Sequence, residues 1–155
     1  MLQRIQSLYL LLTTLLSILF LKGEYLTFFD NSGSSIQMSL SEIVRINASM
    51  DPETTTDVKV LMILAFLIPL LSMLIIFLFK NRKRQMVLTG ILIFLISVFI
   101  GASLIYSYMV ITEYDAAFAS WYKLSVPVIQ LILSVLAYRG IKKDDDLVKS
   151  YDRLR

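Results

Sequence analysis

The stretch that decides the fold runs from residue 60 to residue 111. It reads VLMILAFLIPLLSMLIIFLF (60–79), KNRKRQ (80–85) and MVLTGILIFLISVFIGASLIYSYMVI (86–111). Both apolar runs reach the roughly 20 residues that a helix needs to cross a bilayer core of about 30 Å. Lipid offers no partners for unpaired backbone groups, so such runs must be helical. The sequence therefore predicts two antiparallel membrane helices joined by a short basic turn.

Two further apolar stretches flank this pair, Ile5–Leu21 and Leu124–Tyr138. The first has no small-x-small cleavage site, so we expect an uncleaved membrane helix and not a signal peptide. The second corresponds to only about 22 Å of helix, which is too short to span. We therefore expect its helix to begin near Ala116, with Asp115 as the N-terminal cap.

The predicted fold class is an all-α polytopic membrane protein that forms one domain over residues 1–155. Its four spans are expected at about 5–21, 58–79, 86–111 and 118–138. The chain is 57% hydrophobic with a mean hydropathy of +0.72, well outside the range of soluble domains.

The basic residues predict the orientation of the four spans. Eleven of the fifteen lie before the first span, between the second and third, or after the fourth. These are Arg4, Lys80, Arg82, Lys83, Arg84, Arg139, Lys142, Lys143, Lys149, Arg153 and Arg155. Because basic residues are retained in the cytoplasm, both termini and the 80–85 turn are predicted to be cytoplasmic.

The loop over residues 22–57 is then predicted to be a small extracytoplasmic cap. Residues 25–29 and 35–39 flank a turn-forming Asp30–Gly33 segment, which predicts a short β-hairpin. Ser39 and Glu42 have the spacing of a capping box, so we expect a short helix there. Asp51, Pro52 and Glu53 are typical of a helix start, which predicts that the second helix begins well before the lipid.

No Asp, Glu, Lys or Arg lies in the interior of any span, which argues against ion-coupled transport. Gln130 is the most polar deep residue. It can contact a substrate or, more commonly, form an interhelical hydrogen bond to Thr13, Thr14, Ser17 or a partner. Pro69 marks either a hinge or an ordinary helix kink. Three small residues, Gly90, Ser97 and Gly101, share one face of the third helix and predict close helix packing.

The predicted cytoplasmic segments carry two candidate surfaces. Lys80, Arg82, Lys83 and Arg84 can attract anionic lipid, at about 1 kcal/mol per basic residue, or act only as a topological anchor. The tail over residues 139–155 has acids before bases, in line with the helix dipole. Its apolar stripe, Leu147, Tyr151 and Leu154, predicts a helix that docks on this protein or on a partner.

The composition also excludes several chemistries. The chain has no cysteine and no histidine, which removes disulfides, thiolate sites and the commonest general base and metal ligand. We therefore expect no cofactor, no metal site, no catalytic residue and no nucleic-acid partner.

Three segments resemble a known family: Met1–Leu12, Ile76–Gln85 and Asp152–Arg155. They are similar to the domain-of-unknown-function family of small four-helix inner-membrane proteins of Bacteroidota. The resemblance spans the whole chain and implies the fold, the bacterial inner membrane and the orientation. It implies no activity, substrate or catalytic residue.

The favoured function is a non-enzymatic accessory subunit or assembly factor that packs against a larger membrane complex and contacts membrane lipids. Short loops and the absence of charge inside the spans favour it. A small transporter or channel, alone or as an oligomer, is the main alternative, and a lipid-handling protein is a weaker one.

Overall fold

The computed structural model describes residues 3–21, 25–30, 34–46, 52–79, 81–120 and 122–153. These residues form four α-helices, a short 3₁₀ helix and five strands. The helices are α1 (Gln3–Phe20), α2 (Lys59–Phe77), α3 (Arg82–Tyr114), η1 (Tyr122–Leu124) and α4 (Ser125–Arg153). The strands are β1 (Leu26–Phe29), β2 (Ser35–Met38), β3 (Glu42–Ile46), β4 (Pro52–Asp57) and β5 (Ala117–Ser120).

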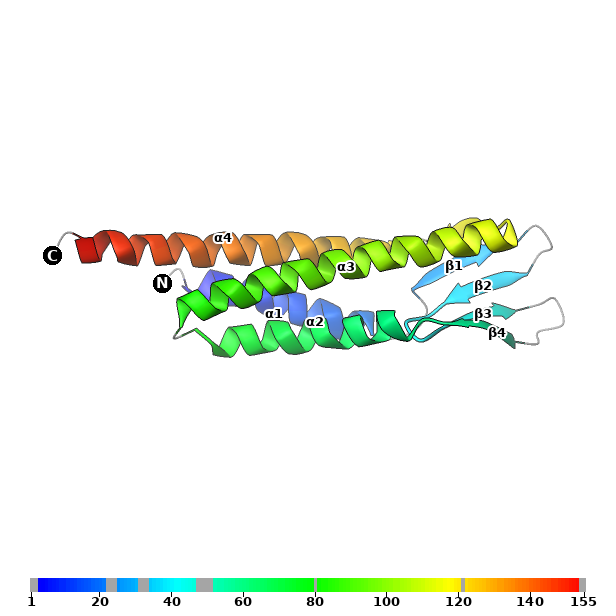
Figure 1. Cartoon of the computed structure of the whole chain (residues 1–155), viewed down its shortest axis with the longest axis horizontal. Helices are drawn as coiled ribbons and strands as arrows, with labels where there is room; N and C mark the ends of the chain where they lie inside the picture. Colours follow the sequence, from blue (N-terminus) through cyan, green and yellow to red (C-terminus); the bar gives the residue numbers. More distant parts are fainter. Residues whose placement is uncertain are drawn as a thin grey trace.

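The four helices form an elongated bundle with the sheet at one end (Figure 1). Helix α1 contacts α2 and α4, and α3 also contacts α2 and α4, so each helix has two antiparallel neighbours. We call the end with the five strands the sheet end. The opposite end, where α1 begins, α2 turns into α3 and α4 finishes, is called the tail end.

Each helix buries one seam of side chains spaced alternately by three and four residues. This spacing is typical of left-handed bundles with coiled-coil-like packing. The buried residues that define the seams are Leu10, Thr13, Ser17 and Phe20 on α1; Leu61, Ala65, Ile68 and Ser72 on α2; Thr89, Leu92, Ile96 and Phe99 on α3; and Gln130, Ser134, Ala137 and Ile141 on α4.

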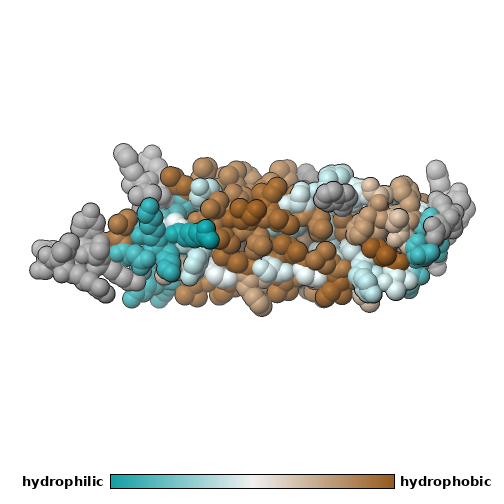
Figure 2. All heavy atoms as spheres, turned by 90° about the horizontal axis from the view of Figure 1, so that it is seen from above, coloured by the Kyte–Doolittle hydropathy of each residue, from teal (hydrophilic) through white to brown (hydrophobic). Residues whose placement is uncertain are grey.

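The exposed side chains of the bundle are mainly large and apolar, whereas several of the buried ones are polar. Figure 2 shows a broad hydrophobic band between more hydrophilic ends. Three helical segments, 59–77, 82–114 and 122–148, are long and apolar enough to cross a membrane, and the apolar part of α1 is shorter. Because water disfavours such a surface, the bundle is suited to lipid. The prediction of apolar helices long enough to cross a membrane is confirmed for these three segments.

The described strands form one antiparallel sheet in the order β4-β3-β2-β1-β5. One face buries Leu26, Phe28, Ile36, Met38 and Ile43. At the junction with the bundle, the Phe20 ring on α1 meets the Tyr25 and Phe99 rings edge-on, each at a centroid distance of 5.8 Å. The aromatic junction therefore joins sheet and bundle into one hydrophobic core.

The expected hairpin is confirmed, because β1 and β2 pair antiparallel with Phe29 opposite Ser35. The all-α prediction needs a correction, since the hairpin is part of a five-stranded sheet. The short helix expected after Ser39 is wrong. The Ser39 hydroxyl does accept a hydrogen bond from the Glu42 amide at 3.2 Å, but the Ser39 amide also donates to the Glu42 carbonyl at 2.9 Å. These bonds close a turn between β2 and β3.

Two predicted helix starts are also wrong. Of the expected start at Asp51–Glu53, Pro52 and Glu53 instead begin strand β4, which pairs with β3, and α2 begins only at Lys59. Asp51 lies outside the described residues. Asp115 does not begin the fourth helix. It ends α3 in the left-handed conformation, with a φ of 47° that an aspartate tolerates. The next residues form β5 on the edge of the sheet, so α4 starts at Ser125, and not near 116–118.

Candidate functional site

A buried polar cluster ties three helices together at the tail end. The Gln6 Nε2 atom on α1 donates a hydrogen bond of 2.7 Å to Oδ2 of Asp144 on α4. From the start of α3, Arg82 Nη1 donates to the Asp144 backbone carbonyl at 2.9 Å. The Asp144 residue is only 8% exposed, so its carboxylate depends on this partner in place of water.

The cluster leaves little internal space. Gln6, Arg82, Gln85 and Asp144 line a hollow of about 10 Å³, which is at the lower limit for one water molecule. The Gln85 side chain donates to the Ile75 carbonyl at 3.4 Å, close to the end of α2. The cluster therefore connects all four helices and has no room for a substrate.

Gly140 on α4 makes this arrangement possible. A Cβ atom at this position would lie 2.7 Å from Cγ of Gln6, which is closer than real contacts allow. Glycine costs about 1 kcal/mol in a helix interior relative to alanine, so its presence here has a packing reason. Gly140, Gln6 and Asp144 were not predicted as site residues from the sequence. An interior helix glycine was the one available signal.

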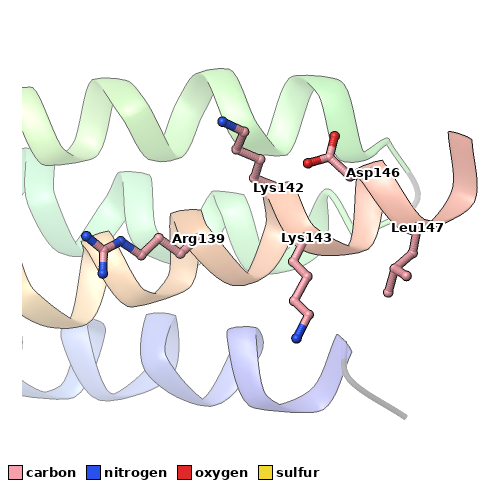
Figure 3. Close-up of a pocket in the computed structure, with 5 residues that line it drawn as sticks. All are labelled: Arg139, Lys142, Lys143, Asp146 and Leu147. Carbon is pink, nitrogen blue, oxygen red and sulfur yellow. The ribbon is translucent and has the colours of Figure 1, made fainter. Parts of the chain in front are cut away.

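Arg139, Lys142 and Lys143 line an open hollow of about 450 Å³ along α4, together with Asp146 and Leu147 (Figure 3). In this view Lys142 and Asp146 point to one side of the helix and Lys143 points to the other. Lys142 and Asp146 are one helical turn apart, so the carboxylate reduces the positive charge on that side.

A second hollow lies beside the turn between α2 and α3. It has a volume of about 340 Å³ and is lined by Leu78, Lys83, Arg84, Val87 and Leu88. No acidic residue is among these five. Of the four basic residues proposed from sequence as lipid contacts, Lys83 and Arg84 are exposed here, and Arg82 binds Asp144. Lys80 lies outside the described residues.

At the sheet end, polar contacts hold the strands to the end of α3. The Arg45 guanidinium on β3 forms an ion pair with Asp30, and its Cζ lies 5.4 Å from the centre of the Tyr114 ring. Burial raises the pKa of the Tyr25 hydroxyl to about 12, and the nearby Ser103 side chain offsets part of this rise. Tyr25 is therefore neutral over the physiological range.

The polar residues inside the bundle are paired within the chain. Gln130 Nε2 donates to the Ser17 hydroxyl at 3.1 Å, one of the interhelical bonds considered above, and Thr14 bonds to Ser72 at 2.7 Å. Next to the buried Pro69, the Ser72 hydroxyl also lies 3.1 Å from the Pro69 carbonyl, so it remains in contact with a polar partner within α2. The hydroxyls of Thr13, Ser17, Thr89, Ser103, Ser107 and Ser134 donate to the carbonyl four residues earlier.

The small-residue face of α3 does not pack against any part of the chain that the structure describes. A Cβ atom on Gly90 or Gly101 would meet no atom within 4 Å among the described residues, and Ser97 is exposed. This face is on the opposite side of α3 from its buried seam. Any close helix contact there would involve a second protein.

The tail is not a separate docked helix. Helix α4 continues without a break to Arg153. Leu147 is 41% exposed, so it is not buried against the described residues of this chain, and its docking on a partner stays a prediction. The Tyr151 side chain and Leu154 lie outside the described residues.

The family model described as "Domain of unknown function (DUF4293)" matches residues 2–154. The chain belongs to this family. The match covers nearly the whole chain and confirms the resemblance to a domain-of-unknown-function family. No curated protein matches the chain. Membership of DUF4293 therefore assigns no chemistry to the polar cluster or to the two basic hollows.

The arrangement is suited to binding and packing. Within the described ranges, no three acidic side chains lie close enough together to hold a metal ion. The charged residues gather at the two ends of the bundle, while the apolar band has only hydroxyl and amide groups in its interior. The Gln130–Ser17 and Thr14–Ser72 bonds join helices, most of the other hydroxyls bond within their own helix, and the outer surface of the band stays apolar.

Proposed function

We propose that the chain is a four-span protein of the bacterial inner membrane that serves as a non-enzymatic accessory subunit or assembly factor. Its termini would lie in the cytoplasm and its five-stranded sheet outside. Its partners would be membrane lipids and a protein in the same membrane. The distribution of basic residues supports the orientation, because eleven of fifteen lie at the tail end or its flanking segments.

The observation that carries the proposal is the open small-residue face of α3. Gly90, Ser97 and Gly101 lie on the side that points away from the bundle, between exposed side chains such as Phe94 and Ile105. Small residues on a membrane helix let a neighbouring backbone approach closely. Because none of the four described helices occupies that face, a partner helix would fit there.

The interior of the bundle supports a structural role. The uninterrupted apolar runs of the spans (5–21, 60–79, 86–111 and 124–138) contain no Asp, Glu, Lys or Arg, and Gln130–Ser17 and Thr14–Ser72 form two hydrogen-bonded pairs. Ion-coupled transporters usually place ionisable groups inside the membrane. A polar seam whose members already bond to each other favours helix association over transport.

The proposal is tested by purifying the tagged full chain from its native membranes in mild detergent. The wild type and Gly101→Ala should co-purify with one partner in fixed stoichiometry, because alanine keeps the face small. Gly101→Leu should lose most of that partner while keeping the wild-type melting temperature, since no described atom lies within 4 Å of a Cβ at this position.

Two outcomes would contradict the accessory role. A wild-type chain that purifies only as a monomer or homo-oligomer, and that conducts ions in liposomes, would favour the channel alternative. Equal partner recovery with Gly101→Leu would show that the partner does not use this face.

A further inference from the structure

We propose that the hollow beside the α2–α3 turn is a binding site for one anionic phospholipid. The phosphate would contact Lys83 and Arg84, and an acyl chain would lie against Leu78, Val87 and Leu88. The inference rests on the membrane insertion proposed above. It goes further by assigning one site and one lipid class.

The order of residues along α3 matches the order of groups in a phospholipid. Lys83 precedes Val87 by four residues and Arg84 precedes Leu88 by four, so each cation lies one turn from an apolar side chain on the same face. Lys83, Arg84 and Val87 are all exposed, and Leu78 and Leu88 are partly buried. A cationic rim is thus stacked directly on an apolar wall.

The chemistry of the rim selects an anion. Arg84 offers a planar guanidinium fork that matches a phosphate, and Lys83 adds a point charge beside it. The lining residues include no acid, in contrast to the hollow on α4, where Asp146 lies among the bases. The side chain of Arg82 is directed to Asp144 and is not counted in this site.

The depth and size of the hollow select a lipid over a free anion. It lies where the exposed residues of α3 change from basic (Lys83, Arg84) to apolar (Val87), at the tail-end border of the apolar band. Its volume of about 340 Å³ falls in the range of small-molecule clefts. A free phosphate would leave the apolar wall uncovered, whereas an acyl chain covers it.

The test uses the purified full chain in neutral detergent and follows lipid retention by native mass spectrometry. The probes are long-chain phosphatidylglycerol, long-chain phosphatidylcholine, six-carbon-chain phosphatidylglycerol and inorganic phosphate. We expect long-chain phosphatidylglycerol to bind at least tenfold more tightly than any of the other three. If inorganic phosphate or the neutral lipid binds equally well, the assignment to an anionic lipid is overturned.

A matched pair of variants separates this site from a general basic belt. Lys83→Gln with Arg84→Gln should lower phosphatidylglycerol affinity at least tenfold. Lys142→Gln with Lys143→Gln removes the same charge on α4 and should lower it less than twofold. Equal losses of phosphatidylglycerol affinity in the two double variants would show that the basic residues bind lipid non-specifically. If the first double variant does not fold, the single variants Lys83→Gln and Arg84→Gln replace it.

The apolar half is tested separately by Val87→Trp, which fills the hollow and keeps both cations. Val87 is 64% exposed, so the larger ring does not disturb the bundle. Binding should fall at least fivefold, and unchanged binding would overturn the acyl-chain assignment. A chain that stays soluble without detergent would instead refute membrane insertion. The two failures are therefore distinguishable.

Discussion

Gln6 and Asp144 are 138 positions apart in the sequence and share a buried hydrogen bond of 2.7 Å between the first and last helices. The bond joins α1 and α4 at the tail end of the bundle. Arg82 adds a third helix through the Asp144 carbonyl. The cluster thus links the helices at the tail end, which is the end of the bundle opposite the sheet.

Removing the donor of this bond should destabilise the bundle. Gln6→Leu leaves the buried Asp144 carboxylate without the Gln6 amide, which costs about 1–3 kcal/mol. We expect a lower melting temperature in detergent, followed by circular dichroism. Asp146→Asn is the control, because this exposed acid is on the same helix and should change stability by less than about 0.5 kcal/mol. Equal effects of the two variants would contradict a stabilising role for the bond.

Gly140→Ala should be destabilising although alanine is the better helix former. Alanine gains about 1 kcal/mol of helix propensity, but its Cβ would lie 2.7 Å from Gln6 Cγ, and overpacking costs about 1–3 kcal/mol. Gln6→Ala removes Cγ, so Gly140→Ala should become neutral or stabilising in that background. The double-mutant cycle is measured by thermal unfolding. Additive effects would show that the two residues do not touch.

Alkaline conditions should weaken the sheet end through Tyr25. Its pKa of about 12 in the folded chain exceeds the ordinary 10.0, so the unfolded chain loses this proton first as the pH rises. The stability that Tyr25 contributes is therefore complete below pH 10 and is lost between about 10 and 12. The loss is at most about 3 kcal/mol. The melting temperature of Tyr25→Phe should fall less between pH 10 and pH 11 than that of the wild type. Identical slopes would show that Tyr25 is not buried.

The helices were predictable because a long apolar run in lipid must satisfy its backbone hydrogen bonds internally, as a helix does. The seams within them were not, since residues such as Leu10 and Leu11 look alike in an apolar run. Only the polar Gln130 could be expected to seek a partner. The sheet was harder, because its strands pair across the whole cap. Asp51–Glu53 is typical of a helix start, yet pairing of β4 with β3 decides the structure, and Thr54–Thr56 suit a strand.

The candidate site was predictable only in part. Basic residues around position 83 were visible as a charge cluster, but no local pattern separates Arg82, which binds Asp144, from the exposed Lys83 and Arg84. The pairing of Gln6 with Asp144 had no local signal at all. Contacts between distant parts of the chain decide both the role of Arg82 and the pairing of Gln6 with Asp144.

The topology is the central claim, and single-cysteine labelling tests it most directly, because the natural chain has no cysteine. Ser41, Asn81 and Lys142 are all exposed. Ser41 lies in the turn between β2 and β3, Asn81 in the α2–α3 turn and Lys142 in the tail-end part of α4. With a membrane-impermeant maleimide, Ser41→Cys should react in intact spheroplasts. Asn81→Cys and Lys142→Cys should react only after permeabilisation. Labelling of Asn81→Cys in intact spheroplasts, or of Ser41→Cys only after permeabilisation, would contradict the proposed orientation and spans.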